Sequence, residues 1–193
     1  VYKRQFAMYE AIARGVTLEK LHEITKIDYF FLHKYLNLYN MECRLKEGNI
    51  DAETYLRAKK MGYPDKAIER LSGEKVPMHR DPVYKMVDTC AAEFAAETPY
   101  FYATYDDENE AKEFLDERPK KPCVVVLGSG PIRIGQGIEF DYASVHCVWM
   151  LKQAGYDVVM INNNPETVST DFDVADKLYF EPLTAEDVEA VVQ

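Results

Sequence analysis

The sequence predicts an all-α helical bundle followed by an α/β domain with a parallel sheet. Apolar residues recur at intervals of three and four up to about residue 106, which is the period of an amphipathic helix. From residue 123, short apolar runs alternate with a helical pattern, as in parallel strands joined by helices. A highly charged segment, 106–121, separates the two patterns. We therefore expect a helical domain with an acidic connector at 1–120 and an α/β domain, cut short at its C-terminal end, at 121–193.

Composition argues against several classes of protein. The chain has 193 residues, of which 47% are hydrophobic, so we expect a packed core and not general disorder. Acidic residues outnumber basic ones by 33 to 23, and the net charge of -10 disfavours binding to nucleic acid or to an anionic membrane. No run approaches the roughly 20 apolar residues of a membrane helix, so we expect a cytoplasmic protein. The four cysteines are widely spaced and form no metal-binding pair, so no metal site is predicted.

Capping residues and glycines mark the helix boundaries of the first part. We expect Thr17, Asp28 and Asp51 to cap helix starts and Pro64 to open a further helix. Glycines are expected to end these helices, at Gly15, Gly48, Gly62 and Gly73. The apolar spacing predicts that Phe6 and Phe31 face the core.

Short helices joined by tight turns also occur in helix-turn-helix proteins that bind DNA. In segment 51–72, however, acidic residues interleave with the basic ones, and the whole chain is acidic. A helical packing or assembly module is therefore the preferred interpretation. Segment 88–105 is rich in small and then aromatic residues, and we expect it to dock one domain on the other.

The second part predicts parallel strands around a glycine-rich turn. Strands are expected at 123–127, 157–162 and 177–180, and a helix with a capping box is expected to start at Thr184. Open parallel sheets bind ligands beyond the carboxyl ends of their strands. The binding residues should therefore lie in the segments that follow the first two strands.

The glycine-rich turn departs from two familiar phosphate-binding motifs. Arg133 replaces the third glycine of a dinucleotide fingerprint, and the second strand ends without an acidic residue for a ribose, so a dinucleotide-binding domain is a less favoured alternative. Gln136 stands where a phosphate-binding loop needs lysine. What remains is a small-anion site with Arg133 as its cation. Backbone amides of the turn would surround the anion, at Gly128, Gly130, Gly135 and Gly137.

Three acidic residues flank this turn and the second strand. Glu139 and Asp141 fall in the first turn of the following helix, where interaction with the helix dipole and a ligand-facing role are both open. Glu166 follows the second strand and is expected to face a ligand. No catalytic residue is predicted within this chain.

Three strings resemble the large subunit of carbamoyl phosphate synthetase. They are PVYKMVDTCAAEF at 82–94, GPIRIGQGIEFDY at 130–142 and NPETVSTD at 164–171. Their order matches that family, and the resemblance covers essentially the whole chain. It implies a fragment with the helical oligomerisation domain and a truncated, Rossmann-like pre-ATP-grasp domain. Arg133 resembles the second, carbamate-phosphorylating half, since the first half usually has an apolar residue there.

The resemblance implies an ATP-dependent carbon–nitrogen ligase. Such an enzyme makes carbamoyl phosphate from bicarbonate, glutamine-derived ammonia and two ATP for pyrimidine and arginine biosynthesis. Arg133 and Glu166 would line the carbamate passage into the second site, with Glu139 as a further inward carboxylate. The implied partners are a glutaminase small subunit and further copies of the chain, which would associate through the helical domain.

ATP, Mg²⁺ or Mn²⁺, and K⁺ are expected for the complete enzyme and not for this fragment. The ATP-grasp domain that would hold the nucleotide is expected beyond Gln193. The fragment alone should therefore be inactive. The alternative function is that of a non-catalytic self-association module.

Overall fold

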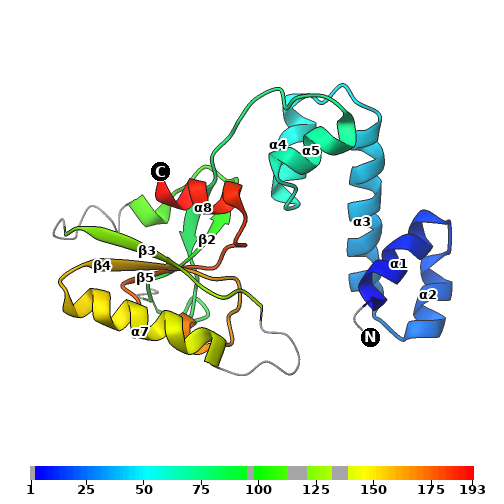
Figure 1. The fold of residues 1–193 in the computed structure, drawn as a ribbon. Coiled ribbons are helices and arrows are strands. Elements are labelled where there is room, and N and C mark those ends of the chain that lie inside the picture. Colours follow the sequence, from blue (N-terminus) through cyan, green and yellow to red (C-terminus); the bar gives the residue numbers. More distant parts are fainter. Residues whose placement is uncertain (1–2, 95–97, 113–120, 132–138) are drawn as a thin grey trace. The chain divides into compact units, whose positions relative to one another are not determined.

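The computed structural model describes residues 3–94, 98–112, 121–131 and 139–193, without the side chains of 139 and 140. Contacts divide the chain into two compact units, Val1–Arg80 (unit 1) and Asp81–Gln193 (unit 2) (Figure 1). Unit 1 is helical and unit 2 has an α/β sheet, so the predicted fold class is confirmed. No helix of the described residues is long and apolar enough to cross a membrane.

The helices of unit 1 begin and end close to the predicted capping residues and glycines. They are α1 (Arg4–Ala13), α2 (Leu18–Thr25), α3 (Tyr29–Lys46), α4 (Ala52–Lys60) and α5 (Asp65–Ser72). The predicted caps Thr17, Asp28 and Asp51 are confirmed, because each side chain accepts a hydrogen bond from a backbone N–H in the first turn of its helix. Gly73 follows α5 with a φ of 73°, a left-handed conformation that favours glycine.

Helix α3 takes part in two separate hydrophobic cores. Its N-terminal half packs with α1 and α2, and its C-terminal half packs with α4 and α5. The buried residues of the first core are Met8, Ile12, Leu21 and Leu32, and those of the second are Met41, Leu45, Ile50, Tyr55, Ala58 and Ile68. The prediction that Phe6 and Phe31 face the core is wrong, since they are 77% and 57% exposed. On α1 the buried residues are Met8 and Ile12, so the apolar spacing identified Ile12 correctly but not Phe6.

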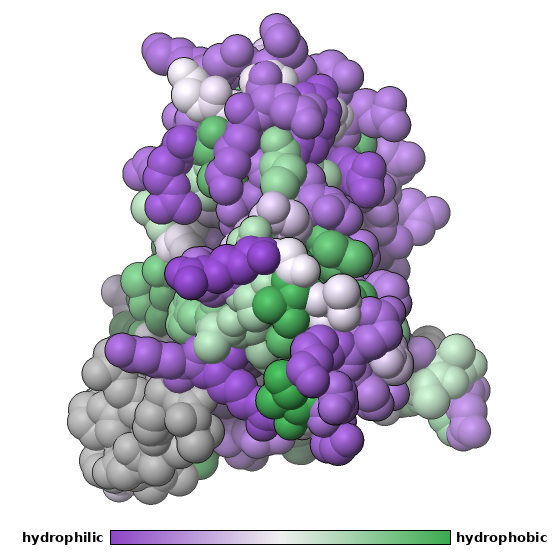
Figure 2. Space-filling model, turned by 90° about the vertical axis from the view of Figure 1, so that its right-hand side faces the viewer, coloured by the Kyte–Doolittle hydropathy of each residue, from purple (hydrophilic) through white to green (hydrophobic). Residues whose placement is uncertain are grey.

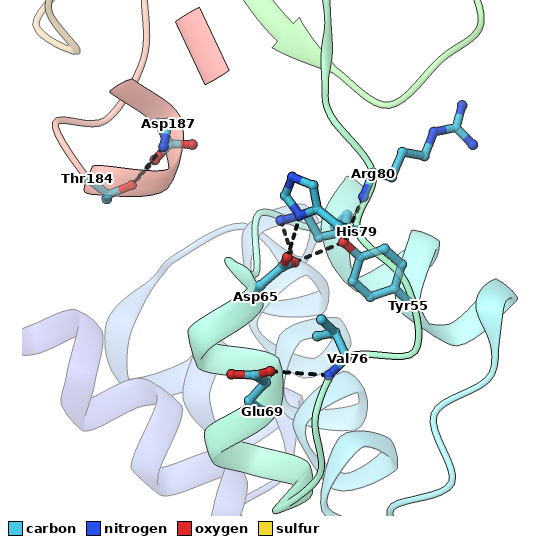
Figure 3. Close-up of polar contacts among 9 residues, drawn as sticks. Tyr55, Asp65, Glu69, Val76, His79, Arg80, Thr184 and Asp187 are labelled. Carbon is cyan, nitrogen blue, oxygen red and sulfur yellow. Dashed lines mark hydrogen bonds and ion pairs between the residues drawn. The ribbon is translucent and has the colours of Figure 1, made fainter. Parts of the chain in front are cut away.

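A half-buried carboxylate, that of Asp65, joins α4, α5 and the segment that leaves unit 1. Asp65 Oδ1 lies 3.0 Å from the buried Lys59 ammonium and accepts a 2.9 Å hydrogen bond from the Tyr55 hydroxyl. Asp65 Oδ2 lies 2.9 Å from Nδ1 of His79 (Figure 3). Burial raises the pKa of Asp65, but hydrogen bonds with His79, Lys59 and Tyr55 outweigh it, so the pKa lies below its usual value. The ionised form therefore stabilises unit 1.

Unit 2 is built on a five-stranded sheet. Its strands are β1 (Val83–Met86), β2 (Tyr100–Thr104), β3 (Cys123–Leu127), β4 (Asp157–Ile161) and β5 (Lys177–Tyr179), in the order β1-β2-β5-β4-β3. Strands β1 and β2 pair antiparallel, whereas β2–β5, β5–β4 and β4–β3 are parallel. The other elements are α7 (Glu139–Gln153), the short 3-10 helix η1 (Val168–Thr170) and α8 (Ala185–Val192).

Helices α7 and α8 cover opposite faces of this sheet (Figure 1). Alternate residues of β4 point to the two faces, as the period of a strand requires. Val158 and Met160 pack in the core below α7, and Val159 and Ile161 pack in the core with α8. The predicted capping box of α8 is confirmed, because the Thr184 side chain accepts from the backbone N–H of Asp187 (Figure 3).

Strands β1 and β2 differ from the sequence interpretation. The predicted helical domain at 1–120 includes residues 83–104, which the structure places in the sheet of unit 2. Segment 88–105 was predicted to dock two domains, yet Tyr100–Thr104 forms an internal strand in which Phe101 is fully buried. Its aromatic composition favours a strand, a preference that the docking interpretation overlooked.

Glu181 continues the β2–β5 ladder with its side chain. Phe180 N–H donates to the Phe101 carbonyl, and two residues further along β2 the Ala103 N–H donates to the Glu181 carboxylate. Glu181 is buried, and this burial, helped by the charge of Asp187, raises its pKa to about 7 despite the Ala103 hydrogen bond. The ionised form of Glu181 is therefore unfavourable in the folded state.

Asp65→Asn should destabilise unit 1 by about 3 kcal/mol, because it removes the carboxylate charge that lies 3.0 Å from the buried Lys59 ammonium. Urea unfolding followed by far-ultraviolet circular dichroism measures the change in the free energy of unfolding. Glu10→Gln is the matched control, since Glu10 pairs with Arg14 on an exposed surface and its loss should cost less than about 1 kcal/mol. Equal losses in the two variants would contradict the role of the buried pair.

Glu181→Gln should stabilise unit 2 in a pH-dependent way. The folded pKa of about 7 exceeds the ordinary glutamate pKa of 4.5, so the stability of unit 2 falls as the pH rises between these two values. The variant should gain about 1–3 kcal/mol near pH 8 and almost nothing near pH 4, because glutamine is neutral and its oxygen still accepts from Ala103. Denaturation at both pH values, with the exposed Glu189→Gln as control, measures this difference. A gain that is independent of pH argues against a buried, titrating Glu181.

Candidate functional site

The candidate site lies where the parallel strands β3, β4 and β5 end. Residues 128–131, 162–167 and 180–184 leave the sheet at this common edge. Open parallel sheets bind ligands there. The first two of these segments contain three of the site residues that the sequence predicts, Gly128, Gly130 and Glu166.

A close contact between Gly128 and Asn162 holds the first two segments together. Asn162 is fully buried, and the Gly128 N–H donates to the Ile161 carbonyl at 2.8 Å. A Cβ atom on Gly128 would lie 2.5 Å from Asn162 Cγ, so no larger residue fits without moving this side chain. Gly130 is also buried and has a φ of 71°. These two glycines are thus explained by close packing and by backbone conformation.

The Asn162 side chain organises the turn that follows β4. Its Nδ2 donates to Ser169 Oγ at 3.2 Å, and its Oδ1 accepts from the Asn164 N–H at 3.4 Å. The Asn164 side chain in turn accepts a 3.1 Å hydrogen bond from the Glu166 N–H. The backbone of Glu166 is therefore tied to the buried end of β4 through two successive asparagine side chains.

Asp141, the third residue of α7, holds the other side of this turn. It is fully buried, and its Oδ2 accepts two 2.6 Å hydrogen bonds, from the Thr167 hydroxyl and from the Ser169 N–H. Its second oxygen, Oδ1, has no hydrogen-bond partner among the described residues. Hydrogen bonds to an ionised carboxylate are shorter and stronger than neutral ones. Asp141 therefore clamps the start of α7 to the turn after β4.

Glu166 projects from a rigid turn at the edge of the sheet. Its side chain is exposed, whereas Ser169 and Thr170, which follow it, are buried. Such a carboxylate can accept hydrogen bonds from an N–H group or attract a cation. Among the residues described here, no three histidine, cysteine, aspartate or glutamate side chains gather as a metal site would require. The described part of this edge thus offers binding groups and no metal centre.

The structure places some of the predicted site residues and leaves others open. Gly128, Gly130 and Glu166 lie at the predicted edge. Glu139 begins α7, which the backbone places beside them, but its side chain is not described. The remaining predicted residues, Arg133, Gly135 and Gly137, fall outside the described part of the chain.

Sequence reasoning missed the two buried polar residues that organise the site. For Asp141, interaction with the helix dipole and a ligand-facing role were both open, and the structure gives it a third role, inside the protein. Asn162 was noted only as a strand end without an acidic group. Its position directly after four consecutive apolar residues, 158–161, was the available signal, because a polar residue there must find buried partners.

Comparison with protein families gives two matches, one for each half of the chain. Residues 2–87 match the oligomerisation domain of the carbamoyl-phosphate synthetase large chain. Residues 120–193 match the carbamoyl phosphate synthase pre-ATP-grasp domain, which includes β3, α7, β4 and β5. Both matches name the same enzyme, and they occur in the order that the sequence motifs predict. The chain therefore belongs to the carbamoyl phosphate synthetase large-chain family.

Proposed function

We propose that this chain is part of a glutamine-dependent carbamoyl phosphate synthetase and forms part of its carbamate passage. The complete enzyme would make carbamoyl phosphate from bicarbonate, glutamine-derived ammonia and two ATP. The observation that carries this proposal is the clamped turn after β4, which presents Glu166 at the ligand-binding edge of a pre-ATP-grasp domain. In this proposal, unit 2 belongs to the half that phosphorylates carbamate.

The chemistry of carbamate accounts for a passage of this kind. Carbamate is an anion that releases carbon dioxide and ammonia when it is protonated, so it needs a guarded route with few available protons. Its amino group donates hydrogen bonds and its carboxylate accepts them. The Glu166 carboxylate would accept from the amino group, and the Arg133 guanidinium would hold the carboxylate. Glu139 would add a second acceptor from the start of α7.

The proposal does not place the nucleotide or the metal ions among the described residues. No cluster of metal ligands is found among them, and the sequence lacks the lysine of a phosphate-binding loop. The proposal therefore assigns ATP, Mg²⁺ or Mn²⁺, and K⁺ to other domains of the complete enzyme. A glutaminase small subunit would supply the ammonia, and the product would serve pyrimidine and arginine biosynthesis in the cytoplasm.

Unit 1 carries a second proposed function, which is self-association. It matches an oligomerisation domain, and three of its phenylalanines lie largely in solvent: Phe6 (77% exposed), Phe30 (61%) and Phe31 (57%). Phe6 also lines an apolar groove of about 480 Å³ with Tyr9 and Tyr35. Figure 2, viewed from the side of α1–α3, shows hydrophobic side chains at the centre and lower part of this face. Exposed apolar surface of this kind marks protein interfaces, and we propose a second copy of the chain as the partner.

Glu166→Gln in the complete synthetase should slow carbamoyl phosphate synthesis on the order of tenfold, the cost of one charge-assisted hydrogen bond. Bicarbonate-dependent ATP hydrolysis should change less than about twofold, because it belongs to the first half of the enzyme. Arg133→Ala should show the same split. The exposed Asp173→Asn, on the segment after η1, is the control and should leave both rates unchanged. An equal loss of both rates in the Glu166 variant would count against the passage.

Replacing Phe30 and Phe31 together by serine should abolish self-association of the chain. Both side chains are exposed, so the fold should survive and the loss should reflect the interface alone. Static light scattering over a range of concentrations measures the mass, which is 22.3 kDa for one copy. Phe172→Ser, at a 68% exposed position in unit 2, is the matched control. A wild-type chain that stays monomeric, or a double variant that associates equally well, would refute the proposal.

A further inference from the structure

We propose that Asp141 is a positioning residue whose buried carboxylate sets the place of Glu166 at the binding edge. This inference rests on the proposed function of Glu166 in the carbamate passage. Asp141 itself has no exposed surface, so it acts through the turn that it holds and not on the ligand. The inference rests on a single oxygen, Asp141 Oδ2, which accepts hydrogen bonds from two donors that follow Glu166 in the chain.

The two donors flank the residues that follow Glu166 in the chain. Thr167, the next residue, donates its hydroxyl to Asp141 Oδ2 at 2.6 Å. Two residues further on, the backbone N–H of Ser169 donates to the same oxygen, also at 2.6 Å. On the other side, the Glu166 N–H donates to Asn164. The backbone of Glu166 is therefore held from both directions, and only the Thr167–Ser169 side depends on a charged group.

Stabilisation of α7 by its dipole does not account for this arrangement. A carboxylate that interacts only with a helix dipole does so from the solvent-exposed first turn. Asp141 is instead completely buried, and burial of a charge is unfavourable unless hydrogen bonds compensate for it. The two hydrogen bonds that Asp141 accepts both come from the turn after β4, and its Oδ1 has no partner among the described residues. The cost of burying the Asp141 carboxylate is therefore offset by hydrogen bonds from the turn after β4 and not by the dipole of α7.

Loss of the clamp has a defined consequence for the site. Without the Oδ2 acceptor, the Ser169 N–H and the Thr167 hydroxyl are left unsatisfied at a buried position, and the short helix η1 loses its tie to α7. Glu166 then samples several positions instead of one. Only the carbamate-dependent step should suffer, since Glu166 belongs to that passage in the proposed function.

The test uses the complete synthetase and compares Asp141→Asn, Thr167→Val and Thr167→Ser. The first two should slow carbamoyl phosphate synthesis on the order of tenfold and change bicarbonate-dependent ATP hydrolysis less than about twofold. Thr167→Ser keeps the hydroxyl and should retain the wild-type ratio of the two rates. The matched control is Asp51→Asn, which alters an aspartate that caps a helix start in unit 1, outside the candidate site.

Combined variants separate this inference from the proposed function. If Glu166→Gln leaves carbamoyl phosphate synthesis unchanged, the proposed function fails. If Glu166→Gln slows it but Asp141→Asn and Thr167→Val do not, the positioning role alone fails. Adding Asp141→Asn to Glu166→Gln should slow synthesis less than about twofold further, because both changes remove the same function. If Asp141→Asn slows both partial reactions equally and lowers the melting temperature, Asp141 has only a structural role and the positioning role is refuted. If Asp141→Asn does not fold, Thr167→Val still tests the positioning role.

Discussion

The site in unit 2 depends on one buried carboxylate. Asp141 draws the start of α7 and the turn after β4 onto a single oxygen atom, and Asn162 fastens the same turn to the end of β4. The space that Asn162 occupies leaves no room for a side chain at Gly128. Interior polar contacts therefore build the ligand-binding edge at the ends of these parallel strands. They hold the backbone of Glu166, whose side chain is exposed.

Two further acids, the half-buried Asp65 and the buried Glu181, show how neighbouring groups decide whether the ionised form is favoured. Asp65 has a buried ammonium, a hydroxyl and an imidazole around it, so its pKa lies below its usual value and its ionised form stabilises unit 1. Glu181 has one backbone N–H and faces the negative charge of Asp187, so its pKa rises to about 7. Each acid connects elements of its own unit. The surroundings of Asp65 favour its ionised form, whereas those of Glu181 disfavour it.

Much of the fold can be predicted from short sequence patterns, whereas the site depends on which polar residues are buried, and no sequence pattern shows this. Capping residues such as Asp51, the apolar strands and the crossover through α7 each have a short-range physical cause, and these predictions are confirmed. The assignment of β2 failed because an aromatic strand and an aromatic docking surface share one composition. Phe6 and Phe31 were misplaced because the helical period fits more than one face. Asp141 was missed because a residue in the first turn of a helix has the same spacing whether it faces water or the interior.

Hydrogen exchange at the Ser169 amide of the wild-type chain, followed by NMR, tests the clamp most directly. The Ser169 N–H lies in the short 3-10 helix η1 and donates to Asp141 Oδ2. If the clamp exists, this amide should be protected to a degree comparable with the amides of β4, since opening it requires breaking a buried charge-assisted bond. Exchange as fast as that of amides in exposed turns would mean that Asp141 does not hold the turn, and the account of this site would be wrong.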